Sequence, residues 1–246
     1  MSRPPPRLYV ESDLRESQGV ELDAKAAHYL VNVLRLGAGD KVALFNGRDG
    51  EWLAEIAAAG RKACTLTPGR QTRPQDPASP LTLAFAPLKK SAMDFLVEKA
   101  TELGVGNLAP VITERTETGR VNGERIQAQA REAAEQCGRT ALPEIAAARP
   151  LAAFLADWPT DQPLWVGDET GGGQAFADAL RSSTGASPRH GILIGPEGGF
   201  TPKELATLAA LPFVNRIDLG PRILRAETAA LASITCWQAL LGDWQA

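Results

Sequence analysis

The chain has 246 residues, of which 44% are hydrophobic, and its formal net charge at pH 7 is −3. This length and hydrophobic content allow one large domain or two smaller ones, and the net charge is not that of a generic basic nucleic-acid-binding protein. The three Cys lack metal-ligand spacing and the two His are few, which favours a protein without a metal site. The chain shows no signal-peptide core and no apolar run of about 20 residues, so we expect a cytoplasmic protein without a membrane span.

Short alternating segments near the N-terminus predict a small β-rich domain. Lys41–Phe45 and Trp52–Ile56 are typical of strands, and Asn46–Gly50 between them is typical of a hairpin turn. The segment Pro68–Pro80 contains four Pro and no aliphatic residue beyond Ala, which predicts a linker. We therefore expect two domains, residues 1–73 and residues 78–246.

Strands and helices alternate after this linker, which predicts an α/β domain with a mostly parallel sheet. The expected strands are Leu81–Pro87, Leu108–Thr113, Leu164–Val166, Gly191–Ile194 and Val214–Leu219. The expected helices are Ala92–Leu103 with Gly104 as its stop, a helix capped by Asn122 that runs to about Cys137, Ala175–Ser182, one that starts at Thr201, and Glu227–Leu241.

Two glycine-containing segments, 194–200 and 219–229, each follow a predicted strand and precede a predicted helix. Thr201, Pro202 and Glu204 form a helix-start pattern directly after the first segment. Ligands of open α/β sheets bind at the carboxyl ends of strands, and glycine lets the backbone approach a ligand closely. Arg222 and Arg225 in the second segment have no evident structural need. The two segments therefore predict a single pocket that is built mostly from backbone.

These two segments resemble the SPOUT class of RNA methyltransferases, and in particular the bacterial ribosomal RNA small subunit methyltransferase E family. The resemblance covers nearly the whole chain. It extends to His28–Leu30, Val33–Leu36, Gly39–Asp40, Lys99–Val105, Pro110, Thr113–Arg115 and Glu132–Arg139.

The resemblance implies a PUA-like β-barrel that holds RNA, followed by a SPOUT-type knotted parallel-sheet methyltransferase domain in which Leu219–Ala246 is threaded through a loop. It implies methylation by S-adenosylmethionine of N3 of one uridine in 16S rRNA, uridine 1498, in the assembled small ribosomal subunit. It also implies a homodimer. Ile234, Trp237 and Leu241, at helical spacing, are candidates for its interface, although the same face would equally pack within one subunit.

The resemblance also assigns candidate site residues. The cofactor-binding set is Gly167, Glu169, Ile194, Gly195, Pro196, Glu197, Gly198, Gly199, Leu219, Gly220, Ile223, Leu224 and Thr228. The catalytic set is Arg225, Arg222 and Glu227. The RNA-binding set is Arg7, His28, Arg35, Arg115 and Arg139.

Each assignment has a simpler competing interpretation. A guanidinium would stabilise the negative charge that develops on the uracil carbonyl oxygens, but a buried Arg225 would equally form a structural ion pair. Glu227 would accept the N3 proton or only favour a helix N-terminus. The RNA-binding candidates are alternatively ordinary surface residues, and surface ion pairs compete for Arg115 and Arg139.

Three other functions stay open at the level of sequence. The first is a SPOUT methyltransferase that acts on another RNA nucleotide. The second is a non-catalytic RNA-binding protein in which the glycine segments are only turns. A nucleotide- or phosphate-binding enzyme with an anion nest at Gly198 and Gly199 is a third possibility. The sequence lacks a P-loop and, at the predicted strand–helix junctions, the Gly-x-Gly-x-x-Gly fingerprint, which counts against the third.

Overall fold

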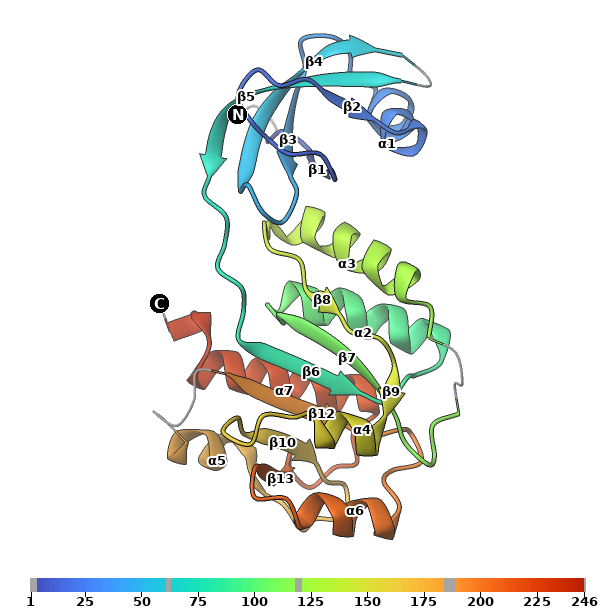
Figure 1. Ribbon diagram of the computed structural model, residues 1–246, viewed down its shortest axis with the longest axis vertical. Helices are drawn as coiled ribbons and strands as arrows, with labels where there is room; N and C mark the ends of the chain where they lie inside the picture. Colours follow the sequence, from blue (N-terminus) through green and yellow to red (C-terminus); the bar gives the residue numbers. More distant parts are fainter. Residues whose placement is uncertain (1–3, 61–62, 118–120, 184–188, 246) are drawn as a thin grey trace. The chain divides into compact units, whose positions relative to one another are not determined.

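The computed structural model describes residues 4–60, 63–117, 121–183 and 189–245. The chain forms two compact units (Figure 1). The N-terminal unit contains residues 1–78 together with 134–142, and the C-terminal unit contains residues 79–133 and 143–246. The end of helix α3 (Gly123–Cys137) and the turn that follows it therefore pack with the N-terminal unit, which the expected division at the linker does not include.

The N-terminal unit is built on a five-stranded sheet. Its strands lie in the order β1-β3-β4-β5-β2 and comprise β1 Arg7–Tyr9, β2 Val20–Leu22, β3 Lys41–Phe45, β4 Glu51–Ala59 and β5 Cys64–Arg73. Strands β3 and β4 form the predicted antiparallel hairpin, and β1 pairs with β3 in parallel. Helix α1 (Ala24–His28) continues as a π-helix over Tyr29–Val33.

Strand β5 corrects one prediction, because it runs six residues into the segment that the sequence assigns to a linker. Proline cannot donate a hydrogen bond within a sheet, so strands tolerate it mainly at edges and bulges. Pro68 pairs with Ala54 at a register shift between Leu53 and Ala54, and this irregularity lets the strand continue to Arg73.

The C-terminal unit confirms the predicted parallel sheet. Eight strands are found among the described residues, and seven of them lie in the order β11-β13-β10-β12-β6-β7-β8 while β9 pairs with β7. Among the described residues, every strand pair of this sheet is parallel. The strands are β6 Leu81–Phe85, β7 Asn107–Ile112, β8 Glu144–Ile145, β9 Arg149–Pro150, β10 Leu164–Gly167, β11 Gln174–Ala175, β12 His190–Ile194 and β13 Val214–Asp218.

Helices cover both faces of this sheet, as parallel sheets require. The helices are α2 Lys90–Glu102, α3, α4 Leu151–Ala156, α5 Phe176–Ser182, α6 Pro202–Ala209 and α7 Ala226–Leu240. Ile192 and Ile194 of β12 pack on α2, α3, α5 and α7, whereas Leu193 packs on the other face with α4 and α6. This alternation fixes the register of β12, and therefore the point at which the chain leaves the sheet.

Local signals place the helix ends where the sequence predicts them. Gly104 has a φ of +84° after α2, and the Asn122 side chain accepts from the N–H of Arg125 at the start of α3. At α6 the Thr201 hydroxyl accepts from the N–H of Glu204, whose carboxylate accepts from the N–H of Thr201 in return. This capping box sets the direction of the chain immediately after the first glycine segment.

The last helix packs inside its own unit. Ile234 and Trp237 are 0% and 2% exposed in the core beneath the sheet, and Leu241 packs against the same core. Their burial is explained without a second subunit, so the homodimer stays a prediction.

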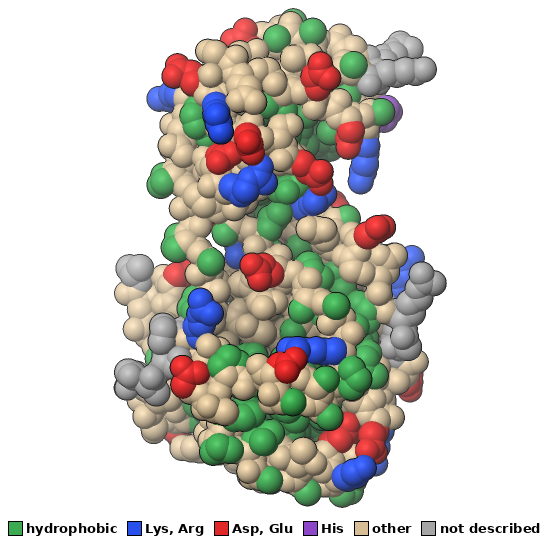
Figure 2. All heavy atoms as spheres, in the orientation of Figure 1, with side chains coloured by type: hydrophobic (Ala, Val, Ile, Leu, Met, Phe, Trp, Pro, Cys, Tyr) green, Lys and Arg blue, Asp and Glu red, His purple; other side chains and the backbone are tan. Residues whose placement is uncertain are grey.

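On the face of the molecule shown in Figure 2, positively and negatively charged side chains are interspersed. Among the described residues, no helix combines the length and the apolarity that a membrane span requires. The same residues contain no cluster of His, Cys, Asp and Glu suited to a metal ion.

Candidate functional site

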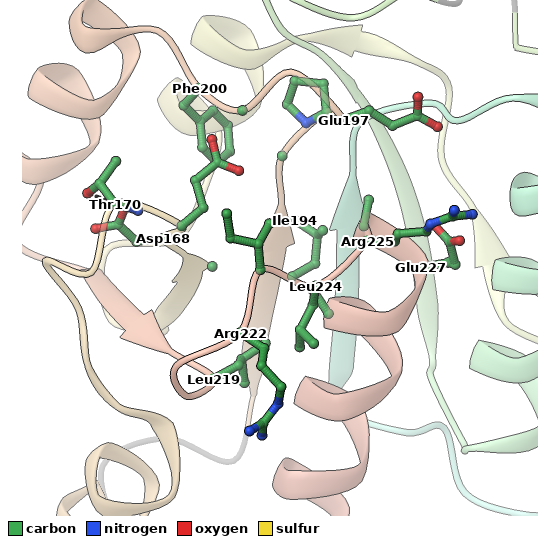
Figure 3. A pocket seen from close by; sticks show the side chains of 18 of the residues that line it. Asp168, Thr170, Ile194, Glu197, Phe200, Leu219, Arg222, Leu224, Arg225 and Glu227 are labelled. Atoms are coloured by element: carbon green, nitrogen blue, oxygen red, sulfur yellow. Dashed lines mark hydrogen bonds between the residues drawn. The ribbon is translucent and has the colours of Figure 1, made fainter.

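A cavity of about 820 Å³ lies at the carboxyl ends of β13, β10 and β12, which are neighbours in the sheet. Its walls come from the loops that follow these three strands and from the starts of α2 and α7 (Figure 3). The two glycine segments predicted to form one pocket therefore do meet. The third loop, 167–171, follows β10, the strand between β13 and β12, and also lines the cavity.

The loop after β12 has a shape that depends on its glycines. The N–H of Gly199 donates to the carbonyl of Pro196 at 2.9 Å, which closes a turn. Gly199 itself has a φ of +68°, and a Cβ built on it would lie 1.6 Å from a carboxylate oxygen of Glu169. The ring of Phe200 packs against Gly195, where a Cβ would lie 2.8 Å from it. A side chain at either glycine would displace a wall of the cavity.

Asp168 holds the loop after β10 in place. Its side chain is 1% exposed and accepts from Arg216 Nε at 2.7 Å, from the hydroxyl of Thr170 at 2.7 Å and from the N–H of Thr170 at 3.0 Å. Burial alone raises the pKa of this carboxyl, but the hydrogen bonds from Thr170 and Arg216 outweigh it and hold the pKa below its usual value. The carboxylate thus fixes the loop as an anion.

We expect Asp168→Asn to lower the free energy of unfolding by about 2 kcal/mol at pH 7, because a neutral amide cannot replace the charged hydrogen-bond partner of Arg216. The pKa of Asp168 is depressed in the folded state. Its contribution is therefore fully present above the unfolded pKa, about 4, and is lost as the pH falls through the folded pKa. Urea unfolding at pH 3 to 7 should show the difference from wild type shrinking at acidic pH. A difference that is constant over this range would contradict the ion-pair role.

The loop after β13 presents two arginines at the cavity. A carboxylate oxygen of Asp218 accepts from the N–H of Gly220, which has a φ of +102°. Arg222 and Arg225 are both exposed, and within the described part of the chain neither guanidinium has a hydrogen bond or ion pair. Figure 3 shows the two side chains extending in different directions. The buried structural ion pair that competed as an explanation of Arg225 is therefore not formed.

Arg225 and Glu227 sit where the last helix begins. Arg225 occupies the N-cap position of α7 with extended backbone, and Glu227 lies in its first turn, half-buried. Leu219, Ile223 and Leu224 provide apolar wall nearby, with Ile223 90% exposed. The cavity thus combines apolar surface, backbone and a pair of guanidiniums that have no hydrogen bond or ion pair with the residues that the structure describes.

Most of the predicted cofactor-binding and catalytic residues line this cavity. Those that do are Gly167, Glu169, Ile194, Gly195, Pro196, Glu197, Gly199, Leu219, Gly220, Ile223, Leu224, Arg222, Arg225 and Glu227. Gly198 and Thr228 are not in the lining. A Cβ on Gly198 would face Arg115 at 3.6 Å, and Thr228 is exposed on α7.

Sequence reasoning missed the wall that comes from the start of α2. Lys89, Ser91 and Ala92 line the cavity because β6 ends beside β12. The signal was present, since β6 is also a strand whose carboxyl end reaches this edge of the sheet. It carried no glycine motif and so did not stand out.

Arg7 has a structural role in the N-terminal unit. Its guanidinium pairs with Glu51 at 2.7 Å, lies 4.4 Å from the centroid of the Phe45 ring, and donates to the carbonyls of Ala134, Glu135 and Arg139. These carbonyls belong to the end of α3 and the turn beyond it, where intrahelical donors run out. That of Ala134 also accepts from the N–H of Gly138 at 3.2 Å. Arg7 is therefore not an ordinary surface residue, and its role in RNA binding stays a prediction.

The other RNA-binding candidates divide between the two units. In the N-terminal unit, His28 and Arg35 are exposed at the end of α1 and beyond the π-helix, and Arg139 is half-buried. Arg35 has a φ of +59°, an unusual conformation for a residue with a side chain. In the C-terminal unit, Arg115 donates to the carbonyl of Gly198 at 2.8 Å and so holds the glycine loop.

Comparison with known proteins gives consistent matches over both units. Residues 74–238 match the model of an RNA methyltransferase domain, and residues 22–69 match an RNA methyltransferase PUA domain. The chain is 36% identical to the ribosomal RNA small subunit methyltransferase E of Rickettsia conorii, over 93% of each chain. It is 31% identical to the same-named protein of Synechocystis, over 96% of this chain and 78% of the relative.

Two solved structures are similar to this chain over nearly its whole length. The ribosomal RNA small subunit methyltransferase E from Neisseria gonorrhoeae, bound to S-adenosyl methionine, superposes with a TM-score of 0.86 at 28% identity, over 98% of this chain and 99% of that one. A methyltransferase from Legionella pneumophila in complex with the same cofactor also has a TM-score of 0.86 at 28% identity, over 96% of this chain and 98% of that one.

Proposed function

Because this chain belongs to the family of ribosomal RNA small subunit methyltransferases E, we propose that it transfers a methyl group from S-adenosylmethionine to N3 of a uridine in 16S rRNA, uridine 1498. We place this reaction in the cytoplasm, on an assembled small ribosomal subunit. The observation that supports the proposal is the cavity itself. The loop after β12 with its glycines, the loop after β10 with Asp168 and the loop after β13 with Arg225 meet there, at the ends of three neighbouring strands.

The cavity fits the cofactor. Its volume of about 820 Å³ lies within the roughly 300–1,000 Å³ of small-molecule sites. Gly220 leaves open space where a side chain would stand, with only the tip of Arg222 within 4 Å. Ile194, Leu219 and Leu224 offer apolar wall, while the backbone of the two glycine segments offers polar groups. S-adenosylmethionine supplies an activated methyl group, so this chain mainly positions the reactants and stabilises charge.

The proposed task of Arg225 is electrostatic. The N3 of a neutral uracil carries a proton that it must lose, and the negative charge then spreads onto the flanking carbonyl oxygens. The Arg225 guanidinium, which has no partner among the described residues, is placed to donate to these oxygens as the charge develops. Arg222 is the second candidate for this role. Glu227 is placed either to accept the proton or to favour the N-terminus of α7.

RNA binding is proposed for both units. His28, Arg35 and Arg139 are the candidates in the N-terminal unit, and the PUA domain match supports that role. Arg115 is the candidate in the C-terminal unit. We further propose the trefoil knot over Leu219–Ala246 and a homodimer, in line with the SPOUT resemblance. Sedimentation that shows a monomer with full activity at micromolar concentration would contradict the homodimer.

The proposed function is tested by nucleoside mass spectrometry of 16S rRNA from cells that lack the protein. We expect 3-methyluridine to disappear and to return when the wild-type chain is supplied. Calorimetry with S-adenosylmethionine separates the enzyme from a non-catalytic RNA-binding protein, and calorimetry with ATP tests the nucleotide-binding alternative. Unchanged 3-methyluridine together with loss of another methylated nucleoside would assign the chain a different target.

Arg35→Gly separates RNA binding from folding. Glycine adopts a positive φ without cost, so we expect the free energy of unfolding to stay the same or to rise by about 1 kcal/mol. Loss of one charged RNA contact should raise the KM for small subunits by about tenfold without changing cofactor affinity. Lys41→Ala is the control, because Lys41 is an exposed cation of the same unit that pairs with Glu55. Equal effects of the two variants on KM would remove Arg35 from the proposed interface.

A further inference from the structure

Three loops of the C-terminal unit converge on the ammonium group of Lys89. Lys89 directly precedes α2, Glu117 lies in the loop after β7, and Glu197 lies in the loop after β12. The Lys89 Nζ is 3.4 Å from a carboxylate oxygen of Glu117 and 3.5 Å from one of Glu197. Lys89 and Glu197 also line the cavity, so this cluster stands at its rim.

The cluster is poorly suited to stabilise the fold. The side chains of Lys89, Glu117 and Glu197 are 67%, 69% and 44% exposed, and exposed ion pairs contribute little to stability. Both distances exceed the roughly 2.7–2.9 Å of a strong charge-assisted hydrogen bond. The ammonium therefore has two loosely held partners that another anion can replace.

Any RNA strand that delivers a base to the cavity meets negative charge at this rim. Glu117 and Glu197 together carry one more charge than Lys89 neutralises, and Glu227 lines the same cavity. A phosphodiester at this place would be repelled without a cation to receive it. Arg115 is engaged with the carbonyl of Gly198, and Arg222 and Arg225 line the cavity from the loop after β13. Lys89 is the cation that stands between the carboxylates of Glu117 and Glu197.

We propose that Lys89 binds a backbone phosphate of the RNA strand that carries the target nucleotide, and that a phosphate oxygen replaces Glu117 and Glu197 as the partner of Lys89. This proposal rests on the proposed RNA methyltransferase function. Lys89 then positions the nucleotide, whereas Arg225 acts on its base. The hydrogen bond to Glu117 and the charges of Glu117 and Glu197 raise the pKa of Lys89. The anchor is therefore positively charged throughout the neutral pH range.

The test compares full-length Lys89→Ala with Lys90→Ala, which removes the same charge from the neighbouring residue. Lys90 is exposed but lies in a different groove, between α2 and α3. Binding to small subunits from cells that lack the enzyme is measured over a series of KCl concentrations. Each lost phosphate contact reduces the slope of log affinity against log salt concentration by about 0.7 for single-stranded nucleic acid.

We expect Lys89→Ala to show this smaller slope and a KM for subunits about tenfold higher, with single-turnover rate at saturating subunits and cofactor affinity near wild type. Lys89→Arg should restore the slope because it keeps the charge. Lys90→Ala should retain the wild-type slope.

The proposal would be overturned if Lys89→Ala had the same salt-dependence slope and the same KM as a fully active wild-type enzyme measured beside it. An equal reduction in Lys90→Ala would also overturn it, because the effect would then follow net charge alone. Failure of the wild-type protein to methylate these subunits would instead refute the proposed function, so the two failures are distinguishable.

Discussion

Arg225→Ala is expected to fold, to bind S-adenosylmethionine almost normally and to methylate small subunits about 100-fold more slowly in a single turnover, the typical cost of losing one charge-stabilising donor. The guanidinium is exposed, and among the residues that the structure describes it has neither a hydrogen bond nor an ion pair. Its removal therefore leaves no buried charge unpaired. The free energy of unfolding should change by no more than about 0.5 kcal/mol.

Two companion variants sharpen this result. Arg225→Lys should recover little activity, because a point charge cannot reproduce the planar fork of a guanidinium that spans two oxygen positions. Arg222→Ala removes the same charge from the same loop, but its side chain extends in another direction (Figure 3), so we expect a smaller loss. Melting temperature, cofactor affinity and single-turnover rate are measured on all three variants. A destabilised Arg225→Ala protein with a normal rate per folded molecule would refute the catalytic assignment.

Gly199→Val is expected to weaken cofactor binding by about 100-fold. The φ of +68° at this position costs a residue with a side chain about 1–2 kcal/mol, and a β-branched residue is especially disfavoured there. A Cβ would also displace the Glu169 carboxylate from the opposite loop. Both walls of the cavity must then move before a ligand can enter. Calorimetric titration with S-adenosylmethionine measures the loss.

The neighbouring glycine provides the matched control. A Cβ on Gly198 would stand 3.6 Å from the Arg115 side chain, an ordinary van der Waals distance, and would not enter the cavity. Gly198 is also not among the glycines with positive φ. We therefore expect Gly198→Ala to bind the cofactor within about threefold of wild type. Equal loss in both variants would show that the loop is generally intolerant rather than shaped by Gly199.

Short-range signals were enough to predict much of the C-terminal unit. The capping box at Thr201, the stop at Gly104 and the strand ends before each glycine segment depend on residues a few positions apart, which the sequence displays directly. Very short elements such as β8, β9 and α4 were not predicted, because two to six residues carry too little periodicity.

The sequence by itself determined that the chain is an α/β protein with a β-rich N-terminal part, and that each of the two glycine segments follows a strand. That β10 lies between these two strands in the sheet was decided by the tertiary structure. Only the tertiary structure decided that Arg7 holds the end of α3, a partner 127 residues away, that Asp168 is fixed by Arg216, and that Lys89 meets Glu117 and Glu197 at the cavity rim. The physical reason is that backbone propensity and capping act over one or two turns of chain. Which side chains meet across loops instead depends on strand order, and the order β13-β10-β12-β6-β7 brings together residues that no local pattern connects.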